Sequence, residues 1–134
     1  MIADYTANPA FVAADLLSQA EHGVDSQVVL VAVDLVSQKL EEIEREVDAQ
    51  AHALSRVDIV RQSITKSIIV KASSVDEAIA FSNDYAPEHL ILHLAKASEK
   101  VALINNAGSV FVGGYTPERS VCISCDIAVE LLMT

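Results

Sequence analysis

Residues 27–33 read Gln-Val-Val-Leu-Val-Ala-Val, and this almost uninterrupted apolar run decides the fold. A strand in a parallel sheet is covered on both faces, so its sequence is apolar throughout instead of alternating with polar residues. The run therefore predicts a strand in the interior of a parallel sheet. Because parallel neighbours need a crossover connection, usually a helix, the segments on either side should include helices.

Helix-like and strand-like segments do alternate along the rest of the chain. We expect further strands at residues 67–71, 89–94 and 109–112, with the end of another at 2–4. We expect helices at residues 9–22, 35–54, 57–63, 74–85 and 97–105. This order implies right-handed crossovers. The predicted fold is α/β, an incomplete Rossmann-like, mostly parallel sheet with helices on both faces.

The expected ends of the helices carry recognisable signals. Asn8 followed by Pro9 is a typical helix start. Ser74 with Glu77 three residues later forms a capping box. Gly23 stands where a left-handed residue would end the first helix.

Composition narrows the class of protein. The chain has 134 residues, of which 51% are hydrophobic and 21% are charged. This length and composition suit one globular domain. Its net charge of -10 argues against a nucleic-acid partner, because phosphate binding needs clustered Lys and Arg. No apolar run approaches the roughly 20 residues of a membrane span, and no secretion signal is present. We therefore expect a cytoplasmic protein with no membrane partner.

The sequence contains one Cys-x-x-Cys pair, Cys122 and Cys125. Such a pair supplies half of a structural zinc site, and a redox motif would stand between an early strand and a helix. We rank a redox or zinc module built on this pair last among the functional hypotheses.

Gln19 and His22 are three positions apart, so on a helix they would share one face. An amide oxygen and an imidazole on one face could hold a metal ion or a polar substrate. The alternative is a helix end with a histidine that suits the helix dipole. The residues alone leave both interpretations open.

Glu88 and His89 form the second candidate pair. Pro87 ends the preceding helix and leaves them at a loop-to-strand junction. Histidine is the usual general base near neutral pH, and a carboxylate can activate water. The alternative is a solvated carboxylate beside a partly buried histidine. His52 and His93 are interpreted as structural, and the chain has no glycine-rich phosphate-binding signature.

Several segments together match a known family. They are Ile-Ala-Asp at 2–4, Asn-Pro at 8–9, Asp-Leu-Leu-Ser-Gln-Ala-Glu-His-Gly at 15–23, Asp-Ser-Gln-Val at 25–28, Tyr-Ala-Pro-Glu-His-Leu at 85–90 and Ala-Gly-Ser-Val-Phe at 107–111. In this order and spacing the chain resembles histidinol dehydrogenase, in the version that forms the C-terminal part of the fungal trifunctional histidine-biosynthesis protein. The resemblance covers residues 2–118.

The resemblance implies a zinc-dependent enzyme that oxidises L-histidinol to L-histidine through L-histidinal with two NAD. It implies that Gln19 and His22 are zinc ligands and that His89 takes the alcohol proton. Glu88 would activate water for the aldehyde stage. All four side chains would contact the substrate, and the family is homodimeric. NAD-binding residues are not assigned to positions of this chain.

The resemblance stops before the end of the chain. Residues 1–118 are interpreted as a partial histidinol dehydrogenase domain and 119–134 as a divergent tail. The family's Asp ligand in a Gly-Asp-Tyr segment and its C-terminal His ligand find no match here, and Asp126 receives no role. We expect a shifted or mispredicted reading frame or a gene remnant, with little or no activity of the isolated polypeptide. The alternative is a non-catalytic interaction module that pairs with a full-length subunit.

Overall fold

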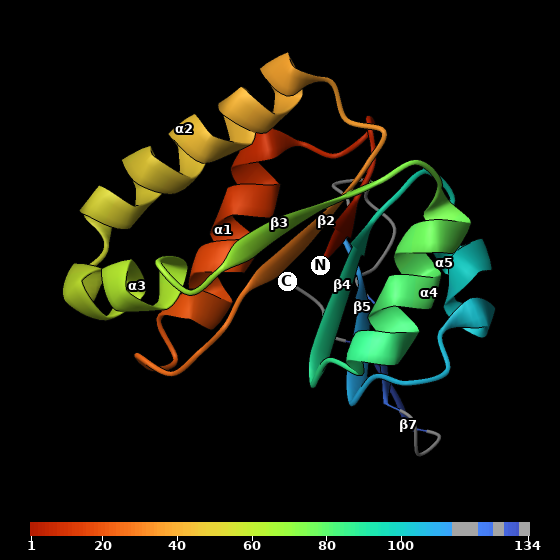
Figure 1. Cartoon of the computed structure of the whole chain (residues 1–134). Helices are drawn as coiled ribbons and strands as arrows, with labels where there is room; N and C mark the ends of the chain where they lie inside the picture. Colours follow the sequence, from red (N-terminus) through yellow and green to blue (C-terminus); the bar gives the residue numbers. More distant parts are fainter. Residues whose placement is uncertain (114–120, 125–127, 132–134) are drawn as a thin grey trace.

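A computed structural model describes residues 1–113, 121–124 and 128–131, the last two segments by their backbone. These residues form a sheet with strand order β3-β2-β1-β4-β5-β6-β7. Its strands are β1 (Ile2–Ala3), β2 (Val29–Val33), β3 (Ile68–Ala72), β4 (His89–His93), β5 (Ser109–Val112), β6 (Val121–Ser124) and β7 (Ala128–Leu131). Strands β1 to β5 are parallel, and β6 and β7 are antiparallel to their neighbours (Figure 1).

Helices cover both faces of the parallel strands. They are α1 (Pro9–Ala20), α2 (Ser37–Ala53), α3 (Val57–Ile64), α4 (Val75–Tyr85) and α5 (Ala97–Lys100), which continues into the 3-10 turn η1 (Val101–Leu103). Figure 1 shows α1, α2 and α3 on one side of the sheet and α4 and α5 on the other. The predicted α/β fold, mostly parallel with helices on both faces, is confirmed.

The position of β2 in the sheet explains why apolar and polar residues do not alternate in this part of the sequence. All five of its residues are buried. Val29, Val31 and Val33 pack into the core under α4 and α5. Leu30 faces the opposite core under α1, α2 and α3. Because each face of β2 meets its own layer of helices, successive side chains are apolar whichever way they point.

The predicted helix starts are confirmed by their hydrogen bonds. The Asn8 side chain accepts a bond of 2.9 Å from the Ala10 N–H, and the Ser74 hydroxyl accepts one of 3.2 Å from the Glu77 N–H. The Glu77 carboxylate reaches back to Ser73, one residue earlier than a standard capping box, and accepts bonds of 2.7 Å from its hydroxyl and its N–H. These two bonds lower the pKa of Glu77.

The predicted end of the first helix is wrong. Helix α1 ends at Ala20, and its cap residue Glu21 keeps a right-handed conformation with φ -79°. The Glu21 N–H donates to the Leu17 carbonyl, and the His22 N–H donates to the Gln19 carbonyl at 3.2 Å. These bonds close the helix before Gly23, which does not adopt a left-handed conformation. His22 therefore lies in a turn and shares no helix face with Gln19.

The helix expected at 97–105 ends early because Asn83 forms hydrogen bonds with the backbone of the residues that follow it. The Asn83 side-chain oxygen accepts bonds of 2.8 Å from the Asn105 N–H and 3.3 Å from the Asn106 N–H. The Asn106 side-chain amide also donates a bond of 3.0 Å to the Asn83 carbonyl. The helical segment is therefore limited to α5 and η1.

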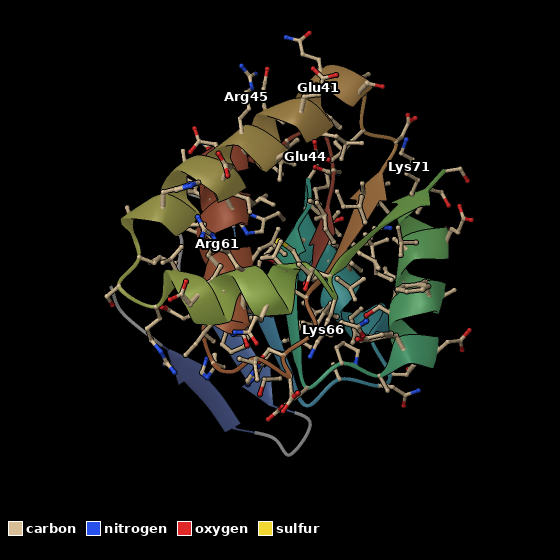
Figure 2. All side chains as sticks on the ribbon, turned by 60° about the vertical axis from the view of Figure 1, so that its left-hand side comes forward. Glu41, Glu44, Arg45, Arg61, Lys66 and Lys71 are labelled. Carbon is tan, nitrogen blue, oxygen red and sulfur yellow. The ribbon has the colours of Figure 1, made fainter. Side chains whose placement is uncertain are left out.

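Figure 2 shows Glu41 and Arg45 on the outer side of α2. Cys125 and Asp126 lie outside the described residues, and for Cys122 the backbone alone is described. Within the described part of the chain, none of the helices has both the length and the apolar character needed to cross a bilayer.

Candidate functional site

Helix α1 and strand β4 are joined by two side-chain contacts. The His89 ring nitrogen Nδ1 lies 3.2 Å from Gln19 Oε1, and His93 Nε2 lies 2.7 Å from Asp15 Oδ2. Residues four apart share one face of a helix, and residues four apart share one face of a strand. The two contacts therefore join a single face of α1 to a single face of β4.

The contact between Gln19 and His89 lies at the amino ends of the parallel strands. Helix α1 begins beyond the carboxyl end of β1 and runs back along the sheet, so its last turn is next to the start of β4. In Rossmann-type sheets, ligands usually bind at the opposite edge, beyond the carboxyl ends of the strands. The candidate residues thus converge on the less usual edge of this fold.

A cavity of about 240 Å³ opens beside these residues. Gln19, Glu88 and His89 line it together with Asp15 and Gln27. Its remaining wall includes apolar side chains from β2, β4 and α4. Amide, carboxylate and imidazole groups that line one cavity together with apolar side chains can bind a small polar molecule and move protons on it.

Backbone contacts hold the loop that carries Glu88. Ala86 ends α4 in the left-handed region, with φ 53°. The Gly108 N–H donates to the Pro87 carbonyl at 3.0 Å, and the Ser109 N–H donates to the Glu88 carbonyl at 2.8 Å. A Cβ atom on Gly108 would lie 2.7 Å from that Glu88 carbonyl oxygen, so glycine is required for this close approach.

The structure brings together three of the four predicted site residues. Gln19 contacts His89, and Glu88 lines the same cavity. The ring of His89 also packs edge-on against Phe111, with centroids 5.9 Å apart. His22 is exposed in the turn after α1 and is not among the described residues that line this cavity.

Sequence reasoning missed the pairing of Asp15 with His93. His93 is 3% exposed, in agreement with its structural interpretation, but Asp15 received no role. The signal was present in the spacing, since Asp15 precedes Gln19 by four residues and His93 follows His89 by four. The spacing places these residues on the matching faces, but four residues advance about 6 Å along a helix and about 13 Å along a strand, so it could not establish their contact.

The described residues supply only some of the ligands that a zinc site needs. Gln19 and His22 provide two donors near the end of α1, whereas a catalytic zinc site takes three protein ligands. Within the described residues, no group of three or more His, Cys, Asp or Glu side chains is placed to hold a metal.

The described residues do not fit a dinucleotide at the usual place in this fold. That place is the crevice beyond the carboxyl ends of β1 and β4, where the strand order reverses. The buried Asp4 carboxylate occupies it and accepts bonds from the Thr6 N–H at 2.9 Å and the Ala95 N–H at 2.7 Å. The loop at residues 4–8 has no glycine, and its negative charge would repel a pyrophosphate.

Comparison with known proteins identifies the family. The sequence profile described as "Histidinol dehydrogenase" matches residues 1–121. The chain belongs to the histidinol dehydrogenase family. It is 61% identical over 118 residues to the histidine biosynthesis trifunctional protein of Neurospora crassa, covering 88% of this chain. It is 50% identical over 117 residues to histidinol dehydrogenase of Schizosaccharomyces pombe, covering 87% of this chain.

A solved histidinol dehydrogenase has the same fold. The crystal structure of the enzyme from Elizabethkingia anophelis matches 86% of this chain with a TM-score of 0.80 and 48% identity. This chain covers 14% of the Neurospora protein, 27% of the Schizosaccharomyces protein and 26% of the Elizabethkingia chain. The family is one of oxidoreductases in histidine biosynthesis, and this chain spans about a quarter of a single-function member.

Proposed function

We propose that this chain forms the acid–base portion of a histidinol dehydrogenase. Such an enzyme would oxidise L-histidinol to L-histidine through L-histidinal with two NAD. Family membership supports the reaction class. The observation that carries the proposal is the contact of 3.2 Å between His89 Nδ1 and Gln19 Oε1 beside the cavity that Glu88 also lines.

This contact prepares His89 to act as a base. An amide oxygen only accepts hydrogen bonds, so the Nδ1 atom that faces Gln19 Oε1 carries the ring proton. In a neutral imidazole the other nitrogen, Nε2, is then the acceptor. His89 Nε2 would take the hydroxyl proton of histidinol as hydride leaves the carbon, which yields the aldehyde.

Glu88 is proposed to serve the second stage. Its carboxylate would take a proton from a water molecule as the water oxygen adds to the aldehyde carbon. The resulting hydrate can lose a second hydride to become the carboxylic acid. The hydride acceptor would bind to parts of a full-length enzyme outside the described residues, because these residues do not fit it at the crevice beyond β1 and β4.

Gln19 and His22 are proposed to hold zinc together with donors from other parts of a full-length enzyme. When bound, zinc would anchor the imidazole and amine of histidinol and so orient the reacting carbon. All four side chains, Gln19, His22, Glu88 and His89, would then contact the substrate. We also propose that the 134-residue polypeptide alone has little or no activity, because two donors rarely hold zinc tightly.

A chimeric enzyme tests the proposed roles. Residues 1–118 of this chain would replace the corresponding 118 residues of the Neurospora crassa protein, to which they are 61% identical. We expect the chimera to form NADH from histidinol, and we expect His89→Asn to reduce kcat by about 10²–10⁴-fold. His52→Asn is the matched control, since His52 lies exposed on α2 and should leave kcat unchanged. Full activity of the His89→Asn chimera would refute the role of His89.

A single-turnover measurement separates the two stages. Glu88→Gln should slow the oxidation of L-histidinol and of L-histidinal, because both need the aldehyde stage to reach the acid. It should leave the first hydride transfer from histidinol intact in a single-turnover measurement.

The alternative function is that of a non-catalytic interaction module. It predicts that the polypeptide binds to a full-length subunit when the two are co-expressed.

A further inference from the structure

The turn that carries His22 is held against the corner between α3 and β3, residues 63–67. The buried Ser63 hydroxyl donates to the Ser26 carbonyl at 2.8 Å. The Lys66 ammonium donates to the Val24 carbonyl at 2.9 Å. Both bonds hold the backbone between His22 and β2, so the position of this turn depends on the corner.

Gln27 lies at the end of the same turn, and both ends of its side-chain amide are bonded. Its Nε2 atom donates to the Lys66 carbonyl at 3.2 Å. Its Oε1 atom accepts a bond of 2.6 Å from the Tyr85 hydroxyl. Because a carbonyl only accepts hydrogen bonds, the amide can meet both partners in this orientation alone. Gln27 therefore links the α3 side of the sheet to the end of α4 on the other side (Figure 1).

Tyr85, the last residue of α4, is held at both ends of its ring. The ring stacks on Phe81, one turn earlier in the helix, with centroids 5.9 Å apart and planes inclined by 19°. Its hydroxyl is held by Gln27. Together these contacts define where α4 ends relative to the turn that follows α1.

The chain has little freedom between Tyr85 and Glu88. Ala86 is in the left-handed region, with φ 53°. Pro87 has its φ angle fixed by the side-chain ring. A shift of Tyr85 is therefore passed on to Glu88 and His89, since the two residues between can absorb little of it.

The two halves of the candidate site are thus joined at two places. Gln19 contacts His89 directly. Gln27 and Tyr85 join the turn that follows Gln19 to the loop that precedes His89. A single contact allows the two segments to pivot about it, whereas two separate contacts also fix their relative orientation.

We propose that Gln27 is a positioning residue, which ties the turn carrying His22 to the loop carrying Glu88 and His89. Gln27 lines the cavity, but both ends of its amide are already bonded, so it acts through Tyr85. The tie itself does not depend on the proposed function, whereas its effect on catalysis rests on that function.

Amide hydrogen exchange in the 134-residue polypeptide tests the tie without any enzymatic activity. Gln27→Met keeps an unbranched side chain and removes both bonds. It should speed exchange of the Gly108 and Ser109 amides, which hold the carbonyls of the Glu88 loop, by about threefold or more, the effect of losing roughly one hydrogen bond. Gln38→Met, at an exposed position in α2, is the matched control. Equal exchange in the two variants would overturn the proposal.

Tyr85→Phe is a second variant that removes the hydroxyl and leaves a ring to stack on Phe81. It should also speed exchange of both amides, whereas Tyr5→Phe, at a side chain that is 75% exposed, should not. The double variant Gln27→Met with Tyr85→Phe should exchange no faster than Gln27→Met alone, because both changes remove the same tie. Effects that multiply would overturn the proposal, since the two side chains would then act separately.

The chimeric enzyme separates positioning from a purely structural contribution. At a temperature at which every variant is folded, Gln27→Met and Tyr85→Phe should each lower kcat by about tenfold or more, because a displacement of about 1 Å can cost about 10²-fold. Gln38→Met and Tyr5→Phe should leave kcat unchanged. Unchanged kcat in Gln27→Met would overturn the positioning role. An inactive unmodified chimera would instead refute the proposed function, and the exchange rates would still decide whether the tie exists.

Discussion

Removing the carboxylate of Asp15 should destabilise the protein through His93. The Asp15 Oδ2 atom is 2.7 Å from His93 Nε2, and the His93 side chain is 3% exposed. In Asp15→Ala the ring nitrogen loses this partner in a site that water barely reaches. Leaving one buried polar group unsatisfied costs about 1–3 kcal/mol.

One effect reduces this value. Position 15 is inside α1, and alanine is a better helix former than aspartate by up to about 0.7 kcal/mol. The Asp15 side chain is 40% exposed, so we assign no further energy to the charge itself. The expected net loss in the free energy of unfolding is about 0.3–3 kcal/mol.

The assay is urea denaturation at fixed pH, followed by circular dichroism. Asp25→Ala is the matched control, because Asp25 is 99% exposed and lies 3.6 Å from Lys66 in a surface ion pair. We expect this control to change the free energy of unfolding by no more than about 0.5 kcal/mol. Equal midpoints for Asp15→Ala and Asp25→Ala would refute the reasoning, since burial of the partner is the only reason to expect a greater loss of stability in Asp15→Ala.

Three other changes should alter stability in directions that the structure determines. Gly108→Ala places a Cβ 2.7 Å from the Glu88 carbonyl oxygen. This clash should cost about 1–3 kcal/mol in the free energy of unfolding, measured by urea denaturation. Ala86→Gly relieves a left-handed alanine and should raise the melting temperature slightly. The relieved strain of about 1–2 kcal/mol exceeds the added entropy of the unfolded chain, which is about 0.4–1 kcal/mol. Raising the pH from 6 to 8 should increase the free energy of unfolding by up to about 2–3 kcal/mol through the Met1 amine. Its pKa is about 6 when folded and 8.0 when unfolded, so the unfolded chain binds more protons between these values.

Each of these changes has a control within the same chain. Gly23→Ala meets no atom within 4 Å and should be tolerated, so a cost equal to that of Gly108→Ala would contradict the steric argument. Ala80→Gly, at an exposed position in the middle of α4, should lower stability by about 1 kcal/mol, opposite in sign to Ala86→Gly. Acetylation of Met1 should remove its share of the rise between pH 6 and 8, and an unchanged profile would contradict the assignment to that amine.

The sequence by itself determined the elements whose causes are local. Residues 27–33 identified an interior strand because both faces of a parallel strand must be apolar. Asn8 and Ser74 identified helix starts, because a cap needs an acceptor only two or three residues from its donor. The motif at residues 85–90 likewise placed Glu88 and His89 at a loop-to-strand junction, as observed.

Local patterns failed where distant residues decide the conformation. The segment at 97–105 was expected to be one helix, but Asn83 holds the backbone of Asn105, 22 residues away in sequence, in another conformation. Gly23 was expected to end α1, yet the helix closes through Glu21 and His22 before reaching it. Glycine permits a left-handed cap without requiring one, so its presence could not decide the boundary.

Only the tertiary structure decided which candidate residues meet. Gln19 and His89 are 70 positions apart in sequence and come into contact because α1 runs back along the sheet to the start of β4. The same arrangement joins Asp15 to His93 and leaves His22 outside the cavity. The sequence determined which side chains carry the chemistry, since a motif is a property of neighbours. Strand order and helix direction determined their distances, because these contacts form only after remote segments have packed.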